Sequence, residues 1–158
     1  MKYVVELRMV DPQPVAGIRV MSHPEDIGAV LSDLLNEVMD FLDTRGVKPT
    51  GPPYNRYFAT QMGAVEFEAG FPIPEPISGE GRVIGTDLPG GQVVHTVHFG
   101  PYNQLREAYR ALGLWLKERN WNTIGPPWEN YIIGPGDDKD PAHWRTEIYW
   151  PVESAPSR

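Results

Sequence analysis

The sequence contains no cysteine, and this absence excludes several kinds of chemistry. Without thiols the chain forms no disulfide, no thiolate metal site and no cysteine nucleophile. It also has no apolar run near the ~20 residues that a membrane-spanning helix requires. Its first residues, Met-Lys-Tyr-Val-Val-Glu-Leu-Arg, carry charges inside the apolar stretch, unlike a signal peptide. These absences predict a cytoplasmic protein with no membrane partner.

The chain is also poor in positive charge, with 14 Lys and Arg against 21 Asp and Glu and a formal net charge of −7. A nucleic-acid backbone is bound by a basic face, so we expect no nucleic acid partner and favour a neutral or cationic one. The polar loop at 137–140 lacks the remaining ligand pattern of a calcium site. Metal-ligand spacing with carboxylates is also missing around the histidines, which are His23, His95, His98 and His143. We therefore expect neither a metal nor a cofactor.

What the chain has in abundance is proline and glycine, 17 and 16 in 158 residues, clustered between periodic segments. Among them a motif occurs twice: Gly-Pro-Pro-aromatic-x-x-Tyr, at 51–57 and again at 125–131. The length fits one domain with a sizeable core. We predict a single domain, residues 1–158, built from two repeats at about 1–75 and 80–153. The seam between two copies of a unit is a natural place for a ligand cleft.

The sequence of each repeat predicts secondary-structure elements in the order β-α-β-β. Helices with one apolar stripe are expected after capping residues Ser22 and Asn103, and Gly46 is expected to end the first helix. Strands are expected at 4–10, 14–20, 54–60, 64–71, 92–99, 128–133 and 144–150. Two such units joined edge to edge make an α+β fold with one antiparallel sheet and both helices on one face. The other face is then left to bind a ligand in a groove at the pseudo-twofold seam.

The last strand contains the most suggestive residue, Glu147. Strand alternation places it with Arg145 and Tyr149 on the helix-free face. One interpretation is a solvated face on which Glu147 pairs with Arg145. The other is a groove carboxylate between aromatic walls, which suits a flat cationic ligand. Aromatic residues do crowd the paired strands of both repeats, although they favour strands in general: Tyr54, Tyr57, Phe58, Trp128, Tyr131, Tyr149 and Trp150.

Several stretches of the second repeat carry a family resemblance. They are His98-Phe99-Gly100-Pro101-Tyr102, Leu105 with Ala108-Tyr109, Trp115-Leu116, Gly125-Pro126-Pro127-Trp128-Glu129-Asn130-Tyr131 and Thr146-Glu147-Ile148-Tyr149-Trp150-Pro151-Val152. Together they resemble the C-terminal half of the GyrI-like small-molecule-binding domain, also called the bacterial transcription activator effector-binding domain. The resemblance implies a groove for amphipathic, often cationic aromatic compounds. It carries the ligand-binding role to Glu147, Tyr57, Trp128, Tyr131 and Tyr149. Glu68 stands at the first-repeat equivalent of Glu147, two residues after Glu66, and is a further ligand-binding candidate.

The chain starts directly with the first strand and is acidic, so the resemblance predicts a stand-alone member rather than part of a DNA-binding regulator. The favoured function is binding of a drug-like aromatic or cationic compound, with Glu147 as the buried counter-charge. The alternative is a hydrolase that opens strained cyclopropanoid-type electrophiles. In that case Glu147 acts as general base, and Tyr131 or Trp128 polarises the substrate. A gyrase-type protein modulator is the third hypothesis. The sequence leaves open whether the chain is an enzyme and whether it is a monomer or a dimer.

Overall fold

In the computed structural model, which describes residues 2–155, the chain has an α+β fold of two α-helices and antiparallel strands. It divides into two compact units. The N-terminal unit comprises residues 12–89, and the C-terminal unit comprises residues 2–11 and 90–155. Within the described part of the chain, neither α-helix is both long enough and apolar enough to cross a membrane.

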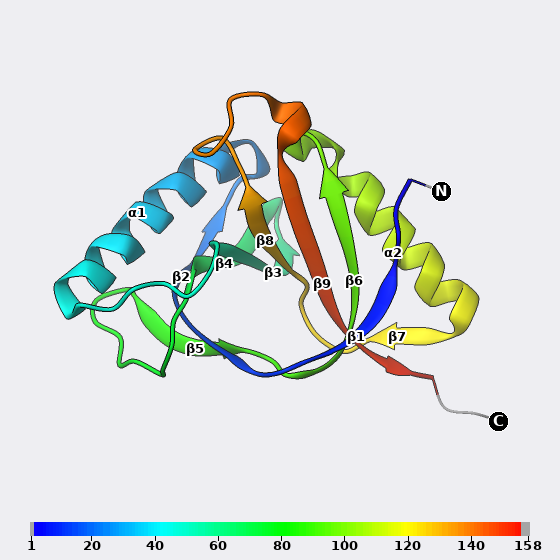
Figure 1. Cartoon of the computed structure of the whole chain (residues 1–158), viewed down its shortest axis with the longest axis horizontal. Coiled ribbons are helices and arrows are strands. Elements are labelled where there is room, and N and C mark those ends of the chain that lie inside the picture. The colour runs from blue at the N-terminus through cyan, green and yellow to red at the C-terminus, as the bar shows by residue number, and fades with distance from the viewer. Residues whose placement is uncertain (1, 156–158) are drawn as a thin grey trace. The chain divides into compact units, whose positions relative to one another are not determined.

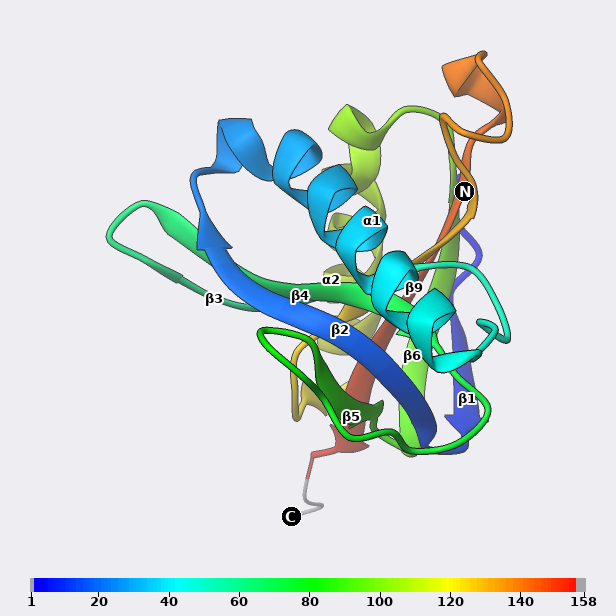
Figure 2. The same ribbon diagram turned by 90° about the vertical axis from the view of Figure 1, so that its left-hand side faces the viewer.

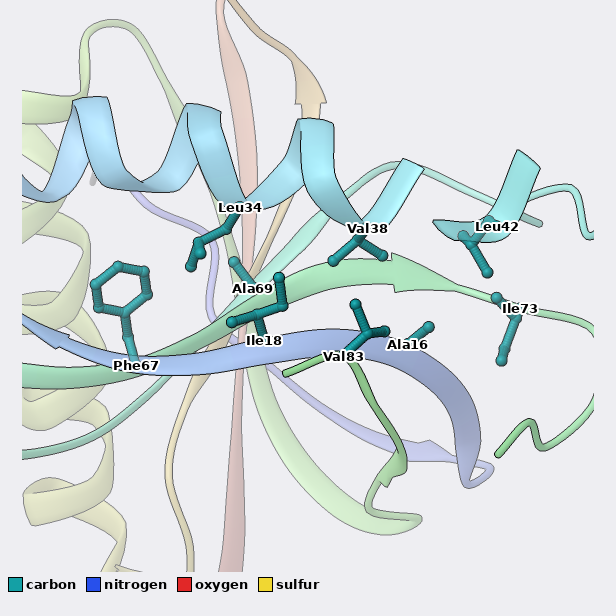
Figure 3. Close-up of a cluster of buried hydrophobic side chains, with 9 residues drawn as sticks. All are labelled: Ala16, Ile18, Leu34, Val38, Leu42, Phe67, Ala69, Ile73 and Val83. Carbon is teal, nitrogen blue, oxygen red and sulfur yellow. The ribbon is translucent and has the colours of Figure 1, made fainter. Parts of the chain in front are cut away.

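The N-terminal unit is an antiparallel sheet packed against one helix. Its strands lie in the order β5-β2-β4-β3, with bounds β2 (Gln13–Ser22), β3 (Tyr54–Gln61), β4 (Ala64–Pro72) and β5 (Ile84–Leu88). A 3₁₀ turn (Pro24–Asp26) leads into α1 (Ile27–Arg45), which lies across β2 and β4 (Figure 2). The apolar stripe of α1 buries Leu34, Val38 and Leu42 against the sheet (Figure 3). Full burial of each such side chain contributes about 1.5–3 kcal/mol.

The C-terminal unit repeats this design. Its main strands lie in the order β1-β6-β9-β8, with bounds β1 (Glu6–Val10), β6 (Gly91–Phe99), β8 (Trp128–Ile133) and β9 (Arg145–Ser154). The short β7 (Trp121–Thr123) pairs with the end of β9. A 3₁₀ turn (Tyr102–Gln104) precedes α2 (Leu105–Arg119), which runs alongside β6 and β9 (Figure 1). A third 3₁₀ turn (Pro141–His143) precedes β9. The helix buries Ala108, Leu112 and Leu116 against the sheet.

The predicted α+β class and the order β-α-β-β are confirmed in both units. The strands β5 and β7 were not predicted, because neither has a long alternating pattern. The first repeat was expected to begin at residue 1, but β1 pairs with β6, with Glu6 opposite His95. The N-terminal strand therefore belongs to the C-terminal unit. Pairing between segments so far apart in the sequence has no local signature.

The two predicted helix caps are wrong. The Ser22 hydroxyl donates to the His23 carbonyl (3.0 Å), and neither helix has a side-chain cap at its start. Each helix instead begins with a 3₁₀ turn next to a proline, whose fixed φ suits a helix start. In such a turn a main-chain carbonyl accepts the hydrogen bond from an amide that a capping side chain would otherwise bind. One example is the bond from Asp26 N to His23 O (2.9 Å). Gly46 does end α1, in the left-handed conformation with φ 66°.

Candidate functional site

Strand pairing fixes how the two repeats correspond. The β8–β9 register places Asn130 opposite Glu147, and the β3–β4 register places Arg56 opposite Glu68. Glu68 is therefore the counterpart of Glu147, as the sequence indicates. The residues paired with the two carboxylates differ, because an amide faces Glu147 and a guanidinium faces Glu68.

Glu147 lies on the helix-free face of the C-terminal unit, as strand alternation predicts, because the next residue, Ile148, is buried in the α2 core. Its side chain is 15% exposed and already has partners. His95 Nε2 lies 2.8 Å from Glu147 Oε1, and the Tyr149 hydroxyl donates to the same oxygen at 3.2 Å. The Arg145 guanidinium lies 3.8 Å from Oε2. The Glu147 carboxylate is thus compensated by three neighbouring side chains.

Aromatic rings pack beside the hydrogen-bond network around Glu147. The rings of Trp128 and Tyr149 stack with centroids 5.4 Å apart and planes 12° apart, and Trp128 is 4% exposed. Burial raises the pKa of Tyr149, and the charge on Glu147 raises it further. Burial lowers the pKa of His95 more than its bond to Glu147 raises it, so the imidazole is neutral at pH 7. Its Nδ1 atom has no hydrogen-bond partner among the described residues.

A second carboxylate, Glu129, occupies the opposite face of the same strands. It is 1% exposed and accepts hydrogen bonds from the hydroxyls of Tyr109 on α2 (2.7 Å) and Tyr131 (2.8 Å). Tyr131 faces this way because it pairs with Thr146, one position before Glu147 on β9. The structure therefore groups Tyr131 with Glu129 and α2, although the sequence predicted it beside Glu147.

A row of aromatic rings continues from Tyr131. Tyr102, in the turn before α2, contacts Tyr131 edge-on with centroids 5.6 Å apart, and Trp144 packs on Tyr102 at 4.9 Å. Burial raises the pKa of Tyr102 to about 12, and the negative charge of Glu129 adds to the shift. Thr146 is fully buried beside Tyr131, and its hydroxyl has no hydrogen-bond partner within residues 2–155. The arrangement is a buried carboxylate flanked by tyrosines from α2, β8 and the turn before α2.

In the N-terminal unit, Glu68 is a buried carboxylate that forms an ion pair. It is 1% exposed, accepts a hydrogen bond from the Tyr54 hydroxyl at 2.5 Å, and lies 3.4 Å from the Arg56 guanidinium. Gly17 makes room for this contact, because a Cβ there would lie 2.3 Å from the Tyr54 hydroxyl oxygen. The predicted contact Tyr57 packs on Phe67 in the core beneath α1, on the other face of the strands. Glu66 forms an exposed ion pair with Arg19 (3.1 Å).

Glu129 was not among the site residues predicted from the sequence. The signal was present, because alternation along β8 puts Glu129 and Tyr131 on one face. Nothing in the sequence showed that Tyr109 of α2 would reach the same carboxylate. Among residues 2–155, no cluster of three or more His, Cys, Asp or Glu could hold a metal ion.

Solved structures share this fold. The crystal structure of the EcmrR C-terminal domain matches with TM-score 0.85 and 25% identity, over 98% of this chain and 100% of that one. The chain spans 59% of the longer EcmrR chain in its DNA complex. SAV2435 bound to tetraphenylphosphonium matches with TM-score 0.65 and 14% identity, over 97% and 94% of the two chains. A hydrolase from Listeria innocua matches with TM-score 0.65 and 11% identity, over 94% and 91%. No curated protein matches the chain.

A match to a protein-family model covers almost the whole chain. The model describes the GyrI-like small molecule binding domain, and it matches residues 3–153. The match includes both repeats and confirms the resemblance carried by the second. The chain belongs to the GyrI-like small-molecule-binding domain family.

Proposed function

We propose that the chain binds an amphipathic aromatic cation in its C-terminal unit, with Glu129 as the counter-charge. The observation that carries this proposal is a carboxylate that is 1% exposed and bound by two tyrosine hydroxyls. Removing a carboxylate from water costs several kcal/mol, and hydrogen bonds to the anion offset part of that cost. A cationic ligand beside Glu129 gains from the low local dielectric, whereas a neutral analogue does not.

The rings beside Glu129 suit the rest of such a ligand. Tyr131, Tyr102 and Trp144 form the continuous aromatic row described above. A cation over an aromatic face gains about 0.5–2 kcal/mol, with the larger value where water is excluded. The Thr146 hydroxyl, which has no hydrogen-bond partner among residues 2–155, adds one polar contact for an oxygen or nitrogen on the ligand. SAV2435, which has the same fold, was solved with tetraphenylphosphonium, an aromatic cation of this class.

This proposal moves the counter-charge from Glu147 to Glu129 and keeps Tyr131 as a ligand contact. Glu147 has Arg145, His95 and Tyr149 around it. The aromatic row that starts at Tyr131 lies on the face that carries Glu129, and this row is the reason for the choice. Trp128 and Tyr149 are stacked on one another beside this network. Glu68 is neutralised in the same way by Arg56, within the N-terminal unit.

Two isosteric substitutions test the assignment. Glu129→Gln and Glu147→Gln each remove one negative charge, and tetraphenylphosphonium serves as the probe, with neutral triphenylphosphine oxide as the matched ligand. We expect Glu129→Gln to weaken binding of the cation about tenfold or more, equivalent to about 1.4 kcal/mol. The neutral ligand should lose far less, and Glu147→Gln should leave both affinities near wild type. Equal affinity of wild type and Glu129→Gln for the cation, measured by calorimetry, would reject the assignment.

A hydrolase is the second candidate, and one observation favours it. The His95–Glu147 pair has the form of a general base oriented by a carboxylate, with Nδ1 unpartnered in the described part of the chain. In this reading His95 takes a proton from water, and the water oxygen bonds to a carbon of the strained ring as a ring carbon–carbon bond breaks. Glu147 stabilises the imidazolium until the proton passes to the released carbon. Tyr131 cannot assist there, because it faces Glu129. Incubation with a strained cyclopropane electrophile would support the reading if wild type consumed it and Glu147→Gln did not.

A further inference from the structure

The strand β1 forms the outer edge of the C-terminal unit. It lies beside β6 and pairs with it along one side (Figure 2). In this pairing Glu6 is opposite His95 and Val10 is opposite Gly91. No other strand pairs with it in the described chain. A strand edge of this kind presents main-chain N–H and C=O groups to which another extended segment can add.

The side chains along this edge are unusually apolar for an exposed strand. Val4 is 71% exposed, Leu7 is 40% exposed and Met9 is 72% exposed. The counterpart strand in the N-terminal unit, β5, differs at the equivalent positions. Its register on β2 places Gly85 where β1 has Leu7, and Asp87 where β1 has Met9. A charge on an edge strand discourages pairing, so β5 is protected at a position where β1 is not.

Two exposed charges on β1 are arranged to fit a second copy of the strand. Glu6 and Arg8 lie on one face of β1, on either side of Leu7, and are 3.3 Å apart. In an antiparallel pair centred on Leu7, the residue numbers of opposed positions sum to fourteen, by the symmetry of the pairing. Glu6 of each copy then faces Arg8 of the other, Leu7 faces Leu7, and Met9 faces Val5. Every opposed pair joins opposite charges or two apolar side chains, each a favourable cross-strand pair.

We propose that β1 pairs with β1 of a second copy, antiparallel about Leu7, and joins two C-terminal units into a homodimer. The paired edge covers Leu7 and Met9, which otherwise remain in water. The symmetric register follows from the alternation of charge and apolar residues, so the interface is self-complementary, as a twofold dimer requires. The pairing uses neither Glu129 nor Glu147, so it is independent of the proposed ligand site.

A charge swap tests the register. Glu6→Arg and Arg8→Glu each place like charges opposite one another twice in the dimer, and each should weaken dimerisation about tenfold. The double variant Glu6→Arg with Arg8→Glu restores both pairs and should dimerise as wild type does. Sedimentation equilibrium gives the dissociation constants, and circular dichroism checks the fold of each variant. A monomeric wild type, or a double variant no tighter than the single variants, would overturn the proposal.

Because the chain has no cysteine, a disulfide can report the pairing directly. Leu7→Cys puts two thiols opposite each other at the centre of the predicted interface. Met62→Cys is the matched control, since Met62 is the most exposed large apolar residue among residues 2–155 and lies in the N-terminal unit. Under mild oxidation, Leu7→Cys should form covalent dimers much faster than Met62→Cys. Equal rates would show that β1 does not pair with itself, even if the wild type were dimeric.

Discussion

Substituting Tyr54 by Phe isolates the hydrogen bond that satisfies the buried Glu68 carboxylate. The change removes one hydroxyl and keeps the ring, which is fully buried. The lost bond is 2.5 Å long and ends on a carboxylate that is 1% exposed. Hydrogen bonds to charged groups contribute about 1.5–3 kcal/mol, so we expect the free energy of unfolding to fall by about 2 kcal/mol. For a chain of this length that lowers Tm by about 4–8 °C.

Tyr149→Phe is the matched control for this prediction. It also removes a hydroxyl that donates to a glutamate, but the bond is longer (3.2 Å) and Glu147 is 15% exposed. His95 continues to bind Glu147, so the cost should be below about 1 kcal/mol. Urea unfolding followed by circular dichroism measures both variants, with an unchanged m-value expected. A Tyr54→Phe variant as stable as wild type, or one less affected than Tyr149→Phe, would show that this hydrogen bond does not stabilise the fold.

Three further predictions concern two glycine positions and the pH dependence of stability. Gly70→Ala should destabilise the protein by about 3 kcal/mol in thermal or urea unfolding, because the new Cβ would lie 1.9 Å from the Ala16 carbonyl oxygen. Gly113→Ala should stabilise it by about 0.5–1 kcal/mol, because the helix position is open. The pKa of His95 is lowered in the folded protein, so the unfolded chain takes up the proton first as pH falls below about 6.5. The free energy of unfolding should therefore decrease as pH is lowered through that window. The decrease should be smaller in His95→Gln. Parallel pH profiles for the two proteins would contradict the burial argument.

The sequence predicts the elements of this fold well because each has a local pattern. The apolar stripe of α1 and the alternation along β9 place Leu34 and Glu147 on the faces where the structure has them. The correspondence of Glu68 with Glu147 follows from the duplicated motif and is met by the strand registers. Helix starts were predicted wrongly, because a 3₁₀ turn beside a proline satisfies the amides that a side-chain cap would bind.

The side chains that surround the candidate carboxylates are harder to predict from the sequence. Alternation could have grouped Glu129 with Tyr131, but the hydroxyl of Tyr109 arrives from a helix, and that contact depends on how α2 packs. The pairing of Glu147 with His95 likewise joins β9 to β6, so it depends on strand register. Such contacts between distant segments decide which side chains surround each carboxylate, and no local pattern encodes them.

A crystal structure of the chain with tetraphenylphosphonium tests directly whether Glu129 is the counter-charge of a bound cation. We expect the cation within about 6 Å of the Tyr131 or Tyr102 ring, on the face that carries the Glu129 carboxylate. Occupancy against Trp128 and Tyr149, with Glu147 as the nearest carboxylate, would contradict it.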